Sequence, residues 1–174
     1  MSDVNRRLVT DILRWFFYVL ILLLAYVLQG TPNFLSIGGI KPLFILPVAV
    51  IVSALEGALP GAFFGAFAGM LWDLLSGRTA GFFSLLFIFL GFMVGVTVSL
   101  FLRRSYFNIM LLTLGAGVCV TFVDFLIGYL MFQYTGAATH YFGTIFPTLV
   151  YTTALSPAWY WIISKIHRRF QLYE

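Results

Sequence analysis

The sequence predicts an all-α integral membrane protein, a single polytopic domain over residues 1–174 with six transmembrane helices and both termini in the cytoplasm. Two observations carry this prediction. First, 61% of the residues are hydrophobic and only 9% are charged, whereas roughly a quarter of the residues in soluble domains are charged. Second, the charged residues avoid the long apolar runs, several of which approach the roughly 20 residues that a helix needs to cross hydrocarbon.

Six apolar segments, separated by short connections rich in glycine, proline, serine or charge, are the predicted helices. The first follows Arg6, Arg7 and Arg14 as a secretory signal would, but it lacks a small-residue cleavage site, so we predict that it is retained. The other five follow in order with no room for a second domain. The segments are 15–28, 43–55, 58–75, 82–102, 107–132 and 144–164.

Segment 43–55 leaves two arrangements open. It would form only about 20 Å of helix and contains Pro47, so it is either a tilted full crossing or one arm of a re-entrant hairpin with segment 58–75. We favour two full crossings, because Glu56 at the tip of a hairpin would otherwise stop within the membrane.

A glycine stripe runs through the third segment and ends beside an acid, Asp73. The glycines recur every four residues, just over one helical turn, so they form a stripe of bare backbone along one side of the helix. Interior glycines cost a helix in water roughly 1 kcal/mol each, but in lipid such a stripe permits close contact between helices. The fourth segment offers two further glycines. The predicted helix-packing or partner-interface residues are Gly57, Gly61, Gly65, Gly69, Gly77, Gly91 and Gly95.

Two acids, Asp73 and Asp124, are embedded in apolar sequence. Counting along the helices places both in the outer half of the bilayer. Asp73 lies near the C-terminus of its helix, where the dipole disfavours negative charge, so we expect a partner such as Arg78 or a backbone donor. These acids and nearby threonines are either polar pins between helices, which we favour, or a site for a ligand, ion or proton. The candidates are Asp73, Arg78, Asp124, Thr121, Thr148 and Thr152.

The distribution of positive charge predicts the orientation. Six crossings from a cytoplasmic N-terminus leave only Lys41 and Arg78 outside, which is the bias that orients membrane proteins. Aromatic residues near the predicted span ends are expected to form interfacial belts; they are Trp15, Trp72, Trp159, Trp161 and Tyr141. The cytoplasmic basic residues are Arg6, Arg7, Arg14, Arg103, Arg104, Lys165, Arg168 and Arg169.

The sequence carries no catalytic signature. It lacks a His-Glu-x-x-His pair, a Gly-x-Ser-x-Gly turn and a Walker phosphate loop, and its single cysteine, Cys119, lies inside an apolar segment. His140 and His167 are expected in or near loops, far apart, so neither is predicted to bind a metal, and no cofactor is expected. Nucleic acid is excluded as a partner, because the basic residues flank apolar spans and would meet lipid headgroups.

The block 61–85, which holds the glycines, Asp73, Gly77 and Gly81, resembles the glycine-rich second-to-third helix region of the MreD family of bacterial rod-shape-determining membrane proteins. Chain length, six apolar spans and the basic connection at Arg103 and Arg104 agree with that family over most of the chain. Family members often follow the early proline with a polar residue, whereas Leu43 follows Pro42 here.

The resemblance implies a non-catalytic component of the cell-elongation and peptidoglycan-synthesis machinery, embedded as a multi-pass protein in the bacterial inner membrane. Its implied partners are MreC, the MreB filament, the glycosyltransferase RodA and its partner transpeptidase, besides membrane lipid; self-association is left open. The alternative function is that of a substrate-binding S component of an energy-coupling-factor transporter, whose six-helix fold MreD-like proteins resemble. Such a protein would hold a small vitamin-type ligand near the outer face, where Asp73 and Asp124 are expected.

Overall fold

The computed structural model describes residues 2–32, 34–77, 81–102, 104–132, 143 and 145–171. Within these ranges the chain forms six helices and no β-strand, which confirms the all-α class and the number of helices. Ile37 and Ile40 form an isolated bridge in the connection after the first helix. The helices are α1 (Ser2–Gly30), α2 (Ile45–Glu56), α3 (Ala58–Ser76), α4 (Phe82–Leu100), α5 (Tyr106–Phe132) and α7 (Phe146–Gln171).

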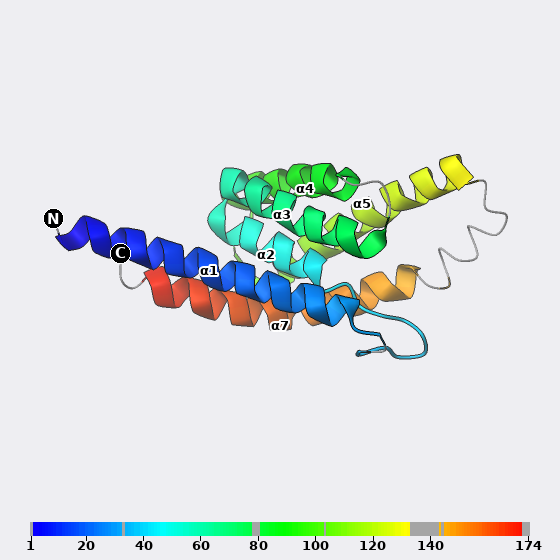
Figure 1. Cartoon of the computed structure of the whole chain (residues 1–174), viewed down its shortest axis with the longest axis horizontal. Helices are drawn as coiled ribbons and strands as arrows, with labels where there is room; N and C mark the ends of the chain where they lie inside the picture. The colour runs from blue at the N-terminus through cyan, green and yellow to red at the C-terminus, as the bar shows by residue number, and fades with distance from the viewer. Residues whose placement is uncertain are drawn as a thin grey trace.

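The helices pack in two pairs around a central helix. Figure 1 shows α3 and α4 side by side along one flank of the molecule and α1 and α7 side by side along the other, with α2 between the pairs. Helix α5 packs mainly against α7 and also contacts α2. The short connection at Gly57 reverses the chain between α2 and α3, so these two helices are antiparallel neighbours.

Helix α2 is the core of the bundle. All residues from Ile45 to Leu55 are buried, and α2 contacts each of the other five described helices. A helix that is buried on every side must be apolar on every side, which explains why this segment lacks a polar face. Its 12 residues measure about 18 Å.

The start of α2 is held by side chains from distant helices. The residue before the helix, Phe44, provides no side-chain cap. Instead, Gln29 Oε1 at the end of α1 accepts the backbone N–H groups of Phe44 at 2.9 Å and Ile45 at 3.0 Å. Thr152 Oγ1 of α7 accepts the N–H of Leu43 at 2.9 Å. Since the first N–H groups of a helix lack partners within it, these bonds allow α2 to begin inside the protein.

Four described helices are long and apolar enough to cross a membrane: 22 residues of α1, all 19 of α3 and of α4, and 21 of α5. Helix α2 is apolar but shorter than these spans. The predicted six membrane helices are therefore matched by six helices in the structure, of which four qualify as spans on length and composition.

The apolar segments predict the helix ends well in the middle of the chain and poorly at its two ends. Helix α1 begins at Ser2, far before residue 15, and α7 continues to Gln171, beyond residue 164. Hydropathy marks where a helix can meet lipid, whereas polar residues such as Arg14 and Asp11, which form an ion pair at 2.9 Å, continue the helix beyond that region.

One sequence prediction is wrong for this reason. His167 lies inside α7 and is only 4% exposed, not in or near a loop. Trp159, predicted near a span end, is 8% exposed and packs edge-to-face on Phe44 with ring centroids 6.2 Å apart. Tyr141 and His140 lie outside the described residues.

Candidate functional site

The glycines at the centre of α3 lie directly against α4. A Cβ atom built on Gly65 would collide with the carbonyl oxygen of Phe87, and one on Gly69 would lie 2.5 Å from the Cα of Ser84. Real Cβ atoms essentially never approach another heavy atom within 3.0 Å. The two backbones are therefore closer than any residue with a side chain would allow, as in small-residue helix contacts in membranes.

Glycines of α4 and a serine of α2 complete this contact. A Cβ on Gly91 would collide with the carbonyl oxygen of Gly61, and one on Gly95 would lie 2.5 Å from the Cα of Ala58. Ser53 Oγ of α2 donates to the carbonyl of Ala49 at 2.8 Å and lies 3.3 Å from that of Gly61. We call this contact the glycine seam; its members are Gly61, Gly65, Gly69, Gly91 and Gly95.

Gly57 and Gly77 have a conformational role at the ends of α3, and the carbonyl carbon of Gly57 also lies 2.5 Å from a Cβ built on Gly95. They stand at the two ends of α3 with φ of 97° and 61°, and a Cβ on either would meet no described atom within 4 Å. Positive φ is the backbone conformation for which glycine is the default residue. These two glycines allow the chain to turn, and Gly77 ends α3 as a left-handed C-cap whose N–H bonds the carbonyl of Asp73.

The Asp73 carboxylate caps the start of α4. Oδ2 accepts the N–H of Gly81 at 3.0 Å, the N–H of Ser84 at 3.2 Å and the hydroxyl of Ser84 at 2.9 Å. Oδ1 accepts the N–H of Phe83 at 3.1 Å. An anion at a helix N-terminus meets free N–H groups and the positive end of the helix dipole. Of the two kinds of partner expected for Asp73, backbone donors are present, and Arg78 lies outside the described residues.

Three of the other polar candidates lie around a cavity of about 330 Å³ between α3, α5 and the start of α7. Asp124, Thr121 and Thr148 line it together with Trp72 and Leu43. Thr152 does not line this cavity; besides accepting the N–H of Leu43, it donates to the carbonyl of Thr148 at 2.7 Å. The structure thus brings three of the predicted polar residues to one cavity. Asp73 and Thr152 instead accept backbone N–H groups at the start of α4 and just before α2.

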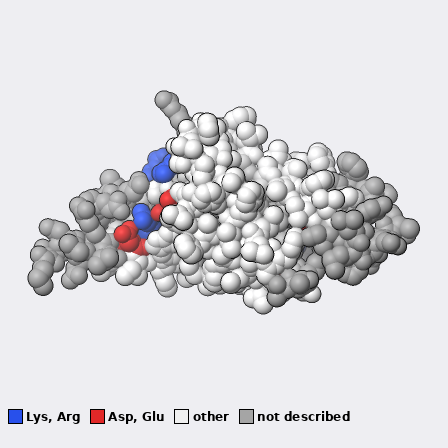
Figure 2. Space-filling view, turned by 90° about the horizontal axis from the view of Figure 1, so that it is seen from above, with Lys and Arg blue, Asp and Glu red and all other residues white. Residues whose placement is uncertain are grey.

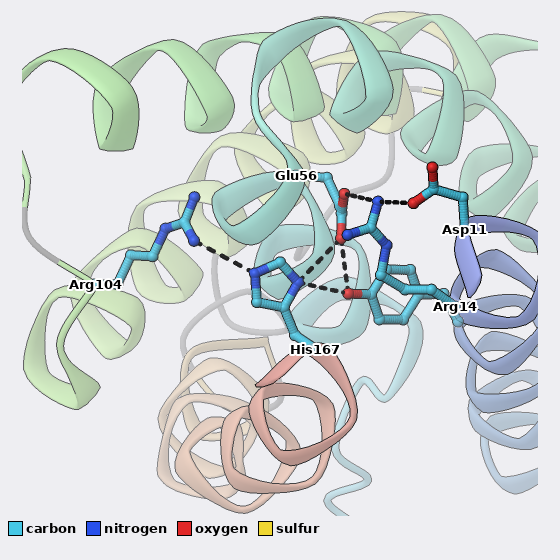
Figure 3. Close-up of polar contacts among 6 residues, drawn as sticks. Asp11, Arg14, Glu56, Arg104 and His167 are labelled. Carbon is cyan, nitrogen blue, oxygen red and sulfur yellow. Dashed lines mark hydrogen bonds and ion pairs between the residues drawn. The ribbon is translucent and has the colours of Figure 1, made fainter. Parts of the chain in front are cut away.

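A second group of polar side chains, which the sequence did not predict, joins the opposite end of α2 to α1 and α7 (Figure 3). We call it the polar cluster. It comprises Arg14 and Tyr18 of α1, Glu56 at the end of α2, Arg104 of the connection before α5, and His167 of α7.

Glu56 is the centre of the polar cluster. Tyr18 donates its hydroxyl to Glu56 Oε1 at 2.8 Å, and Arg14 Nη2 lies 3.5 Å from Oε2. His167 Nδ1 lies 3.1 Å from Oε1 and 3.0 Å from Tyr18 Oη. Tyr18 is fully buried, and the Glu56 side chain is only 8% exposed. A carboxylate this far from water is stabilised only when such donors surround it.

Arg104 brings a further stretch of the chain to His167. Its Nη1 lies 3.4 Å from His167 Nε2. The polar contacts therefore run from Arg104 through His167 to Glu56 and Tyr18. The cluster thereby ties four separate stretches of the sequence together.

The spacing of its residues in the sequence does not identify this cluster. Tyr18 and Glu56 are 38 residues apart, and Glu56 and His167 are 111 residues apart. The one usable signal is Glu56 itself, a lone acid immediately after an apolar segment that is buried on all sides. Figure 2 shows that, on the face in view, charged side chains gather toward one end and the rest of the described surface is uncharged.

Comparison with known proteins identifies a family. The sequence model for the rod shape-determining protein MreD matches residues 9–170, which reach from the first helix to the last. This match confirms the resemblance recognised in the block 61–85. Comparisons with curated proteins and with solved structures give no match.

Proposed function

Because the chain belongs to the MreD family of rod shape-determining proteins, we propose that it is a non-catalytic scaffold of the bacterial inner membrane that binds MreC through its transmembrane helices. Family membership gives it a role in rod-shape determination as a multi-pass membrane protein. The match over residues 9–170 is the observation that carries the proposal, since it covers the helical body and not one motif.

The packing of the chain limits where a partner can bind. The glycine seam is filled by the chain's own α3 and α4, so MreC must meet an outward face. Helix α1 offers such a face: Phe16 is 61% exposed, Leu20 50% and Val27 59%. In a membrane, an exposed apolar side chain contacts either lipid or another helix. MreB, RodA and its partner transpeptidase would join through MreC or through the remaining outward faces.

The proposed topology has six crossings with both termini in the cytoplasm. Helix α2 runs from the level of Gln29 to the level of Tyr18 of α1, since it bonds to both. It therefore runs antiparallel to α1 along most of the apolar part of that helix. This length supports two full crossings over a re-entrant hairpin. In a chain whose Cys119 is replaced by serine, a cysteine at Ser105 should be labelled only from the cytoplasm and one at Ile37 only from outside. The reverse pattern would overturn this topology.

Photo-crosslinking in native membranes tests the MreC proposal. A photoreactive residue would replace Phe16 on α1, Phe63 on α3 or Val118 on α5, each of which is exposed. Phe87 on α4, which is 2% exposed, is the buried control. We expect an MreC adduct from at least one exposed position and none from Phe87. Absence of adducts at every outward position, together with failure of MreC to copurify and of the gene to restore rod shape, would refute the scaffold role.

The cavity beside Asp124 favours one alternative, an S-component-like protein that binds a small vitamin-type ligand. Its volume of about 330 Å³ and its mixed apolar and polar lining are within the range of small-molecule sites. Mass spectrometry of the purified protein and of Asp124→Asn decides between the functions. Transport would be supported, and the scaffold role excluded, if the parent chain retains a metabolite that the variant loses while cells that carry the variant keep their shape.

A further inference from the structure

A basic pocket lies where the start of α5 meets the last turns of α7. It measures about 410 Å³, and its lining residues are Tyr106, Trp161, Ser164, Lys165, Arg168 and Arg169. The five α7 residues follow the spacing that places side chains on one side of a helix. His167, which bonds Glu56, belongs to the polar cluster and does not line this pocket.

Among the described residues that line the pocket, three are basic and none is acidic. Lys165 Nζ lies 5.0 Å from the centre of the Trp161 ring, a cation–π distance that directs the ammonium group along the pocket wall. Glu56, the acid that contacts His167 of α7, already contacts Tyr18 and Arg14 as well. No carboxylate among the described residues pairs with Lys165, Arg168 or Arg169, so the positive charge of the pocket suits an external anion.

Ser164 contributes a buried hydroxyl group to the lining of the pocket. The residue is 8% exposed, and its Oγ atom has no hydrogen-bond partner among the described residues. Buried hydroxyl groups are normally bonded, so an unbonded one in the wall of a basic pocket points to a missing acceptor. The other serine of the same helix does not show this feature, since Ser156 Oγ donates to the carbonyl of Thr153 at 2.8 Å.

Tyr106, an aromatic residue of the lining, is held by contacts with residues outside the pocket. Tyr106 packs edge-to-face on Tyr160 with ring centroids 4.8 Å apart, and the Tyr160 hydroxyl donates to the carbonyl of Arg104 at 3.2 Å. Trp161, in the same lining, is 57% exposed. Aromatic residues of this kind typically lie at the level of lipid headgroups.

We propose that this pocket binds the phosphate group of an anionic phospholipid. Arginine and lysine donate charge-assisted hydrogen bonds to phosphate oxygens, and the Ser164 hydroxyl donates a further one. Trp161, which is 57% exposed, contacts the glycerol region and acyl chains, which a free phosphate ion lacks. Basic pockets between membrane helices at the cytoplasmic surface suit such headgroups. Under the proposed topology, the lipid belongs to the inner leaflet.

Native mass spectrometry of the purified full chain tests the proposal. The protein would be equilibrated in detergent with equal amounts of phosphatidylglycerol and phosphatidylcholine, and retained lipid would be counted. We expect preferential retention of phosphatidylglycerol, reduced about fivefold in Arg168→Gln, as expected for losing one cation beside an anionic lipid. Ser164→Ala should reduce it without changing net charge.

Matched controls distinguish binding at this pocket from nonspecific attraction between a basic protein and an anionic lipid. Lys41→Gln removes a charge from the connection after α1, and Ser156→Ala removes a hydroxyl that is bonded within α7; both should retain the lipid as the parent chain does. Equal retention by Arg168→Gln, Ser164→Ala and the parent would refute the site. Displacement of the lipid by millimolar inorganic phosphate would assign the pocket to a soluble phosphate and overturn the lipid proposal. MreC is absent from the assay, so its result is independent of the scaffold proposal.

Discussion

The α3–α4 pair and the polar cluster hold the molecule together by opposite means. In the pair, backbone meets backbone through glycines, and Asp73 bonds residues only eight to eleven positions further along the chain. In the cluster, long side chains join α1, α2 and α7 across as many as 149 residues. A backbone contact admits no additional atom, whereas a side-chain network can lose one member and still be partly satisfied. The two regions should therefore respond differently to substitution.

The largest effect is expected in the glycine seam. Gly65→Leu places a branched side chain where even a Cβ atom collides with the carbonyl of Phe87. The free energy of unfolding should fall by about 3 kcal/mol, the upper part of the range for overpacked cores. Thermal unfolding in detergent, followed by tryptophan fluorescence, would measure it.

Phe63→Leu is the matched control on the same helix, since Phe63 is 75% exposed and faces away from the seam. It should change stability by less than about 0.5 kcal/mol, as surface substitutions usually do. Equal effects of the two substitutions would show that the α3–α4 contact is not as close as described.

The next effect concerns the Asp73 cap. Asp73→Leu leaves three backbone N–H groups and the Ser84 hydroxyl without their acceptor, and should cost about 2–3 kcal/mol, the range for buried donors left unsatisfied. Asp73→Asn keeps one oxygen for the three donors now on Oδ2, so it should cost only about 1 kcal/mol. Both are measured by the same unfolding assay. If Asn were as harmful as Leu, the charge of Asp73 would be needed, and not merely its acceptor atoms.

A smaller effect is expected in the polar cluster. Glu56→Gln retains an oxygen for Tyr18 but removes the charge that faces Arg14, at a cost of about 1–2 kcal/mol. A double-mutant cycle with Tyr18→Phe measures how far the two residues act together. We expect a coupling energy of at least about 0.5 kcal/mol, as for residues in one hydrogen-bond network. Strict additivity would mean that the contacts of the cluster are independent.

The smallest effect should come from the cap of α2. Gln29→Leu removes the acceptor for the N–H groups of Phe44 and Ile45 and should cost about 1 kcal/mol, as the loss of a helix cap does. Gln29→Glu keeps the acceptor and should be tolerated. Hydrogen exchange at these two amides is the direct measurement, since only the Leu variant should expose them. Unchanged protection would show that another group caps the helix.

The sequence predicts contacts better when they are short in range and periodic. The four-residue spacing of Gly61, Gly65 and Gly69 predicts a bare helix face, and the structure places α4 upon it. The same periodicity does not explain Gly57 and Gly77, which continue the spacing but are required for positive φ at the ends of α3. Spacing alone cannot separate a packing glycine from a turn glycine, because both satisfy the same interval.

Composition, apolar segmentation and the glycine period determined the all-α membrane class, six helices and the family, because each is a property of residues close together in the chain. Only the tertiary structure decided the partners of buried polar groups. His167 illustrates the difference: it was expected near a loop, yet it bonds a tyrosine 149 residues away. Similarly, α2 begins within the protein because Gln29 and Thr152 reach it from two other helices. The physical reason is that a buried donor or acceptor must find a partner wherever packing provides one, and packing brings together residues whose distance in sequence carries no signal.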